Sequence, residues 1–111
     1  MLTLENHIGK ITVSELYVKQ LTEQTVLQSF GVAGFSQPSL TEILTGGRRS
    51  PVTILTKDGK LIISIHVKVV YGVNIPAVVR ALMHKVEFAV EDALQLPVSH
   101  VRVYVDEVVE P

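Results

Sequence analysis

The chain has 111 residues, of which 47% are hydrophobic and 19% charged, and its formal net charge at pH 7 is −1. This length predicts a single domain spanning residues 1–111. A charge so close to zero argues against nucleic-acid binding, which needs a basic surface. Because the sequence contains no cysteine, it excludes disulfides, thiol nucleophiles and cysteine-ligated metals.

The N-terminal segment predicts no export. Residues 1–5 have neither the basic nor the apolar region of a secretory signal, so we expect a cytoplasmic protein. The most apolar stretch, residues 61–79, is interrupted by polar side chains and Pro76, whereas a membrane span needs about 18 consecutive apolar residues. We therefore expect no direct membrane insertion, and membrane proximity only through a partner.

The first third of the chain predicts a strand and then a helix. We expect the strand at about residues 7–12 and the helix up to about Ser29, with Thr12 and Glu15 at the spacing of a capping box. The residues expected on one broad, core-facing side of this helix are Tyr17, Val18, Leu21 and Thr25. Those expected on its polar side are Glu15, Lys19 and Glu23.

A connecting region follows this helix. Gly31 lies where a helix C-cap glycine with positive φ would lie. We then expect a short strand at 32–35, a brief helix at 40–44 capped by Ser39, and a mobile loop at 46–51.

The centre of the chain carries the clearest pattern. It predicts a strand at 52–56, a hairpin turn at Asp58-Gly59, and a long strand at 61–71. The apolar face of the long strand consists of Leu61, Ile63, Ile65, Val67 and Val69. Its other, mixed face consists of Ile62, Ser64, His66 and Lys68.

A second helix should begin after Asn74, a good N-cap, with Pro76 in its first turn, and should end near Gln95. Its predicted core face consists of Ile75, Val78, Leu82, Val86, Ala89 and Ala93. Further apolar residues on its flanks, more than one sheet contact needs, are Met83, Phe88, Val90 and Leu94. Because exposed apolar patches mark interfaces, these four residues predict self-association into a homo-oligomer.

The last predicted strand covers residues 98–109, with Val101, Val103 and Val105 alternating with polar residues. The element order is therefore β-α-β-β-β-α-β. This order predicts an α+β fold: a two-layer α/β sandwich whose mixed, mostly antiparallel sheet carries both main helices on one face.

The helix-free face of that sheet is the main candidate site for a protein partner. The side chains expected there are His66, Lys68, His100, Arg102 and Tyr104. Tyr and Arg are enriched at binding hot spots, and the positive charges would favour an acidic partner. An ordinary solvated sheet face is the alternative interpretation.

Other candidate chemistry is weaker. The four histidines are scattered, and His66 and His100, which share the mixed face, would make only a two-ligand site, so we expect no metal. Gly46-Gly47-Arg48-Arg49 is a candidate anion loop, with a plain flexible loop as the alternative. We expect solvated charges, not catalytic carboxylates, at Glu87 and Glu91 and in the acidic end formed by Asp106, Glu107 and Glu110. No catalytic residue and no cofactor is predicted.

Gly31-Val32-Ala33-Gly34 matches the GXXG letters of a KH-type RNA module. Such a loop joins two helices, whereas this segment leads into no second helix and has no basic neighbours. We therefore do not interpret it as an RNA site.

Several strings, in this order and spacing, resemble the alkaline shock protein family, which is also called the glucose-starvation-inducible general stress or envelope stress response family. The strings are residues 9–12, 30–35, 58–61, 69–76 and 97–105, and residues 40–44 resemble the short single-domain branch. The resemblance implies a cytoplasmic, non-enzymatic protein of cell-envelope homeostasis. It also implies protein partners, with a membrane-anchored tether and a fatty-acid-kinase-like protein as the candidates, and self-association.

Two functional hypotheses follow, and nucleic-acid binding stays as a third, weaker alternative. The first is a scaffold or regulatory protein that acts through protein–protein contacts at its helix flanks or its open sheet face. The second is a small-ligand module, binding an acyl or anionic group near Arg48 and Arg49 and linked to lipid metabolism.

Overall fold

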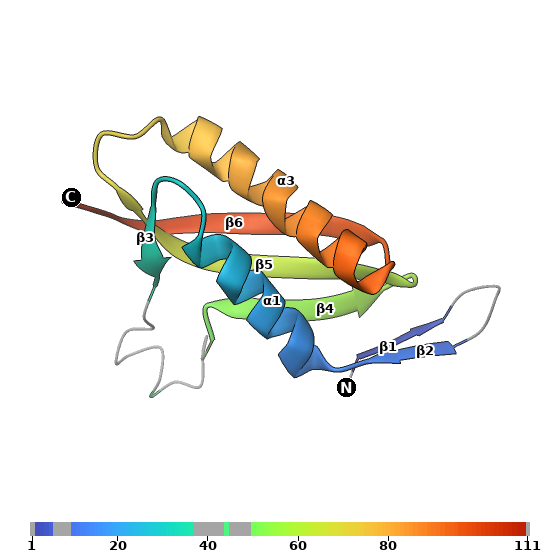
Figure 1. Cartoon of the computed structure of the whole chain (residues 1–111). Coiled ribbons are helices and arrows are strands. Elements are labelled where there is room, and N and C mark those ends of the chain that lie inside the picture. Colours follow the sequence, from blue (N-terminus) through green and yellow to red (C-terminus); the bar gives the residue numbers. More distant parts are fainter. Residues whose placement is uncertain (1, 6–9, 37–43, 45–49, 111) are drawn as a thin grey trace.

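The computed structural model describes residues 2–5, 10–36, 44 and 50–110 (Figure 1). The elements in chain order are β1 (Leu2–Glu5), β2 (Lys10–Val13), α1 (Glu15–Leu27), β3 (Val32–Phe35), β4 (Val52–Lys57), β5 (Lys60–Val70), α3 (Ile75–Leu94) and β6 (Val98–Val109). Both helices lie on one face of the sheet formed by β3, β4, β5 and β6, and the other face carries no helix. The predicted α+β fold with two layers is confirmed.

Strand β5 is the centre of the sheet. It is antiparallel to β4 along its first half and to β3 along its second half, so these two strands lie end to end on one side of it. On its other side β5 pairs in parallel with β6 over nearly its whole length. The sheet is therefore mixed, as predicted, and every one of its described strand pairs includes β5.

The β4–β5 hairpin forms where the sequence predicts it. Asp58 and Gly59 both have positive φ, of 53° and 74°, which is the conformation that a tight two-residue hairpin turn needs. On the helix side of β5 five alternating residues are fully buried: Leu61, Ile63, Ile65, Val67 and Val69. The predicted alternation of this strand is confirmed.

Helix α3 also begins as predicted. The side-chain oxygen of Asn74 accepts a hydrogen bond from the Ala77 backbone N–H at 3.2 Å. The buried row, however, consists of Val78, Leu82, Val86 and Val90, whereas Ala89 is half-buried and Ala93 exposed. The helix thus packs along a single row of i, i+4 neighbours, one of the ridges by which helices pack.

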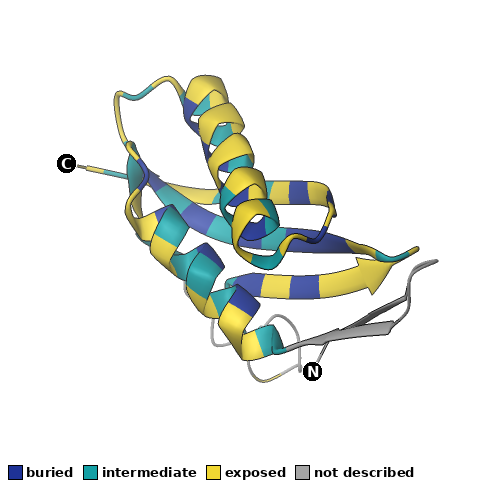
Figure 2. Ribbon diagram, turned by 45° about the vertical axis from the view of Figure 1, so that its right-hand side comes forward, coloured by how far each residue is buried: buried dark blue, intermediate teal, exposed yellow. Residues whose placement is uncertain are grey.

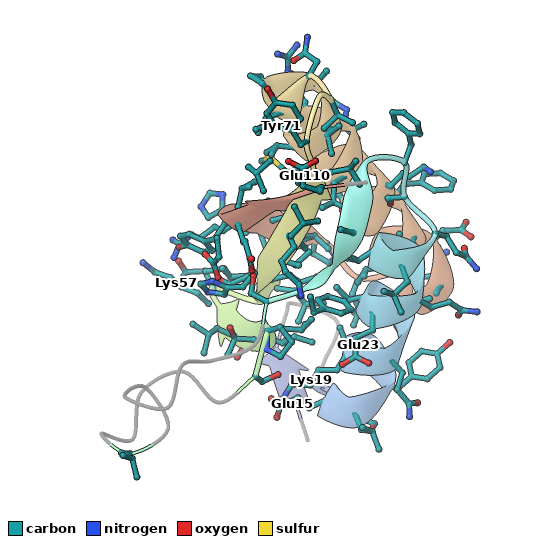
Figure 3. The ribbon with its side chains drawn as sticks, turned by 90° about the vertical axis from the view of Figure 1, so that its left-hand side faces the viewer. Glu15, Lys19, Glu23, Lys57, Tyr71 and Glu110 are labelled. Atoms are coloured by element: carbon teal, nitrogen blue, oxygen red, sulfur yellow. The ribbon has the colours of Figure 1, made fainter. Side chains whose placement is uncertain are left out.

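Helix α1 differs more from the prediction. Its N-cap is Ser14, whose hydroxyl accepts from the Tyr17 N–H at 3.4 Å, while Thr12 belongs to β2, so the predicted capping box is wrong. The buried row is Val18, Thr22 and Val26, and Tyr17 is 49% exposed. Glu15, Lys19 and Glu23, which were predicted to share the polar side, follow one another along α1 in Figure 3. Nζ of Lys19 lies 3.7 Å from Oε1 of Glu15.

The N-terminal strands form a hairpin of their own. β1 pairs with β2 in a separate two-stranded sheet, with Leu2 opposite Val13. The expectation that the first strand joins the main sheet is therefore wrong, because its pairing is satisfied by the preceding segment instead. Residues 7–9 of the predicted strand, most of the brief helix at 40–44, and residues 46–49 of the predicted loop lie outside the described residues.

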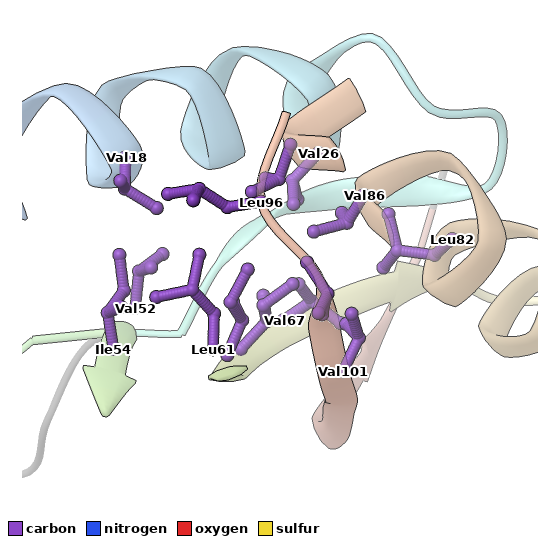
Figure 4. Packing of buried hydrophobic residues seen from close by; sticks show 14 of the residues in the cluster. Val18, Val26, Val52, Ile54, Leu61, Val67, Leu82, Val86, Leu96 and Val101 are labelled. Atoms are coloured by element: carbon purple, nitrogen blue, oxygen red, sulfur yellow. The ribbon is translucent and has the colours of Figure 1, made fainter. Parts of the chain in front are cut away.

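The core lies between the helices and the sheet (Figure 4). Val18 and Val26 of α1 and Leu82 and Val86 of α3 face the β5 row, and Leu96 closes the end near the α3–β6 turn. In Figure 2 the buried colour follows the facing sides of the helices and the sheet, and the exposed colour covers the outer sides of both helices.

Gly31 makes a specific backbone prediction. Its φ is +84°, and a Cβ built there would lie 2.8 Å from Cγ2 of Val78, a buried β-branched side chain with little freedom to move. Gly72 has φ +97° but no atom within 4 Å of such a Cβ. We expect Gly72→Ala to lose about 1 kcal/mol of unfolding free energy through backbone strain alone, and Gly31→Ala to lose clearly more. Urea denaturation measures both variants, and equal losses would contradict the close approach of Gly31 to Val78.

Candidate interaction surfaces

The helix-free face of the sheet gathers the predicted partner-binding residues. The parallel register places Ile62 beside His100, Ser64 beside Arg102, and His66 beside Tyr104. All five predicted side chains, His66, Lys68, His100, Arg102 and Tyr104, therefore lie on this face. His66 and Lys68 are half-buried, while the three residues on β6 are exposed.

His66 is the centre of this face. Its ring stacks on that of Tyr104, with centroids 4.6 Å apart and planes 13° from parallel. Its Nδ1 lies 3.0 Å from Oδ2 of Asp106, to which it donates a hydrogen bond. Its backbone N–H donates to Pro51 and its carbonyl accepts from Ser36, which joins the adjoining ends of β3 and β4 to the same residue. His66 is therefore fixed by contacts from both sides of β5.

Sequence reasoning missed Asp106. The register shifts between Val67 and Lys68, because β6 contains one more residue than β5 at that point. Asp106 lies on the same face as Tyr104 and is exposed, as expected, but its carboxylate also accepts a hydrogen bond from His66, which the sequence did not indicate. Alternation along β6 puts Asp106 on the face of Arg102 and Tyr104, so this pattern could have found it. What alternation cannot reveal is the insertion, which puts Glu107 on the same face beside Lys68.

The charges on this face are divided along β6. His100 and Arg102 form a basic end, whereas Asp106 and Glu107 lie toward the C-terminal end, with Glu107 beside Lys68. An acidic partner segment would therefore fit the end that carries His100 and Arg102 better than the other.

His66 and His100 do not come together as metal ligands in this arrangement. Because His100 lies beside Ile62 and not beside His66, the two histidines are four positions apart along the sheet, about 13 Å. Within the described residues no group of three His, Asp or Glu side chains could hold a metal ion.

The four residues predicted for self-association separate into different environments. Val90 is fully buried in the core, so it cannot form an intersubunit contact. Met83 and Leu94 are partly buried and pack against the core, whereas Phe88 is 71% exposed. The prediction fails for Val90 because α3 is apolar around much of its circumference. The sequence pattern alone therefore does not show which of its rows of side chains packs against the sheet.

The outer helix surface is hollowed beside two exposed aromatic rings. A cleft of about 220 Å³ lies between the α1–β3 connection and the start of α3, lined mostly by apolar side chains such as Phe30, with Ser29, Asn74 and Lys85 as its polar residues. A groove of about 440 Å³ lies between the two helices and includes Phe88 and His84. Phe30 is 83% exposed and Leu27 is 61% exposed, so this surface presents large apolar groups to solvent.

A third hollow lies where α3 meets the outer edge of β6. It has a volume of about 430 Å³ and is lined by Met83, His84 and Glu87 from the helix and by residues 99–102 from the strand. His100 and Arg102 thus border both the helix-free face and this edge.

The remaining predicted residues have other surroundings. The Glu91 carboxylate accepts a hydrogen bond from the Val98 N–H at 3.1 Å and so holds the α3–β6 turn, while Glu87 is exposed. Glu107 and Glu110 are exposed. Arg48 and Arg49, the candidate anion loop, lie outside the described residues.

The comparison with known families identifies the chain. The sequence signature of the alkaline shock protein family, described as having a cell envelope-related function, matches residues 3–110. The chain belongs to this family. No curated protein and no solved structure matches it. Among the described residues, no helix is long and apolar enough to cross a membrane.

The His66–Tyr104 stack can be tested through stability. We expect Tyr104→Leu to lower the unfolding free energy by about 1 kcal/mol, because it removes the ring contact, and Tyr104→Phe to change it much less. Thermal and urea unfolding measure the difference. If the leucine and phenylalanine variants were equally stable, the stack would contribute nothing.

Proposed function

We propose that this protein is a non-enzymatic scaffold or regulatory protein of cell-envelope homeostasis and stress response, which acts in the cytoplasm by binding other proteins and copies of itself. The observation that carries the proposal is the helix-free sheet face, where basic and aromatic side chains from β5 and β6 lie together. An aromatic–arginine surface on a rigid sheet suits protein recognition, because little side-chain freedom is lost on binding.

The kind of partner follows from the charges. Arg102 and His100 project from one strand beside the fixed His66–Tyr104 pair, and none of the described ion pairs includes Arg102 or Lys68. An acidic segment of a partner would meet these cations at one end and the aromatic stack at the other. A membrane-anchored tether or a fatty-acid-kinase-like protein that presents such a segment is the partner expected from the family resemblance, and a tether would also bring the protein close to the membrane.

The partner face makes a direct prediction. We expect the double variant Lys68→Glu, Arg102→Glu to stay folded, because both side chains lie on the helix-free side of the sheet, but to lose its principal protein partner through charge repulsion. Crosslinking pull-down from the native cell measures partner recovery, and circular dichroism measures folding.

The matched control is Arg80→Glu, Lys85→Glu, which makes the same change in charge at exposed positions of α3. It should retain the partner of the sheet face. Full partner recovery by a folded Lys68→Glu, Arg102→Glu variant would mean that the sheet face is only solvated, and loss of partner in both double variants would point to net charge and not to this face.

A small-ligand module is the second candidate function. The cleft beside Phe30 favours it: of the side chains that line this cleft only Lys85 is charged, and the cleft measures about 220 Å³. An apolar cavity of about 150 Å³ can hold benzene, so this cleft has room for the short apolar body of a carboxylic acid whose head reaches Lys85.

This second candidate predicts a thermal shift. Medium-chain fatty acids at concentrations well above their dissociation constant should raise the melting temperature by several degrees, because a ligand that binds only the folded state stabilises it. Ala81→Trp, which fills the cleft, should abolish the shift, and Ala93→Trp, at an exposed position outside it, should not. An unchanged melting temperature of the unmodified protein would remove this candidate and leave the scaffold proposal untouched.

A further inference from the structure

The outer edge of β6 is the longest strand edge in the described structure. β6 has 12 residues, and of the described strands only β5 pairs with it. Its other edge therefore presents backbone N–H and C=O groups that no described strand satisfies. Natural proteins blunt such edges with short strands, lysine and other charges, proline or bulges; Val98–Val109 is long and contains neither lysine nor proline, and it carries a single bulge and charges of both signs.

The charges along β6 are ordered in a way that suits pairing with itself. The first half carries His100 and Arg102, and the second half carries Asp106 and Glu107. When two copies of such a strand run antiparallel, the basic half of each lies beside the acidic half of the other. A parallel arrangement would instead place like charges side by side.

The register shift in β6 fixes which residues meet. Suppose that the two-fold axis passes through Tyr104, so that the two copies of this residue are opposite each other. Val103 is then opposite Val105, and Val101 is opposite Val108. Between them, Arg102 is opposite two residues, Asp106 and Glu107, because β6 contains one extra residue there. Opposing one residue with two is the defining arrangement of a β-bulge. With the bulge included, each pair joins residues from the same face of the sheet, since Val101, Val103, Val105 and Val108 all lie beside helix-side residues of β5.

The hollow beside the edge fits the same arrangement. It is lined by Met83, His84 and Glu87 of α3 and by Ser99–Arg102 of β6. In the antiparallel pair, the acidic C-terminal half of the second copy's β6 runs past this stretch. His100 and Arg102, at the border of this hollow of about 430 Å³, lie on the same helix-free side of the sheet as Asp106 and Glu107 and can meet those of the second copy, whereas Glu87 lines the helix side.

We infer that β6 is a self-pairing edge: it binds β6 of a second copy of this chain, antiparallel and about a two-fold axis at Tyr104, so that the two sheets become one. The inference deepens the self-association in the proposed function by naming its interface. The paired sheets keep their helix-free faces on the same side, which makes one broad face with two partner sites.

Disulfide trapping tests the axis. The chain contains no cysteine, so only introduced thiols can react. Directly opposite residues in an antiparallel pair have Cα atoms about 4.5–5.5 Å apart, within the range of a disulfide. Tyr104→Cys should form a covalent dimer under mild oxidation, while Thr56→Cys, exposed on β4, should stay monomeric.

A charge exchange tests the register. Arg102→Glu should weaken the dimer about tenfold in dissociation constant, because each dimer contains the altered contact twice. Arg102→Glu combined with Glu107→Arg should restore it, since the opposite charges face each other again with their positions exchanged. Analytical ultracentrifugation measures both, and a double variant that stays dissociated would overturn the proposed register.

These outcomes separate the interface from the proposed function. If the unmodified protein is a dimer but Tyr104→Cys crosslinks no better than Thr56→Cys, pairing through β6 is wrong while self-association stands. If the unmodified protein is monomeric at all concentrations, both fail, and only binding of other proteins at the sheet face remains. The charge-exchanged variant keeps Glu at position 102, so it should recover the dimer without recovering an acidic partner.

Discussion

The alternation of β5 is the constraint on which the rest of this structure depends. Its helix-side residues, with Ile63 and Ile65 at the middle, are fully shielded from water and form the floor on which α1 and α3 pack. Burying such side chains contributes about 1.5–3 kcal/mol each, so a slip of one residue in register would expose the core row and cost several times that amount. The same alternation forces Ser64, His66 and Lys68 onto the other face. Core and candidate site are thus two sides of one strand.

The parallel pairing of β6 with β5 then sets the composition of the open face. Asp106 accepts a hydrogen bond from His66, and the extra residue in β6 adds Glu107 to the same face beside Lys68. The surface therefore has a basic end, an aromatic centre and an acidic end. His66 also joins the ends of β3 and β4 through its backbone. The residue that organises the site is therefore also one that holds the sheet together, and a partner meets a surface that is already ordered.

The parts of this fold that the sequence predicts are those with one dominant local pattern. The hairpin at Asp58-Gly59, the bounds of β6 and the start of α3 at Asn74 each rest on a period of two or on a specific turn or cap. The buried row of α1 could not be predicted in the same way, because it includes the polar residue Thr22 while apolar Leu16 and Leu27 are exposed. The face of α3 was ambiguous for the opposite reason: both Ala89 and Val90 are apolar, and only tertiary packing buries the valine.

For the candidate site, the sequence predicts which residues share the face but not how they pair. Alternation places His66 and Tyr104 on one side, yet their stacking depends on the register between two strands that α3 separates in the chain. Asp106 continues the alternation of Arg102 and Tyr104, whereas the position of Glu107 was beyond any local pattern, since the inserted residue reverses the alternation after Asp106. The outer helix surface with Phe30 and Phe88 was only partly foreseen, because exposure of single aromatic residues is decided by the packing of α1 against α3.

The central claim is that other proteins bind the helix-free face of the sheet. Site-specific photocrosslinking in the native cell tests it most directly, with a photoreactive residue at Thr53, which lies beside Ser64 on that face, or at Arg80 on the outer side of α3. The account predicts that the photoreactive residue at position 53 crosslinks one discrete partner protein and that the one at position 80 does not crosslink this partner. The same partner crosslinked from position 80 and absent from position 53 would contradict the account.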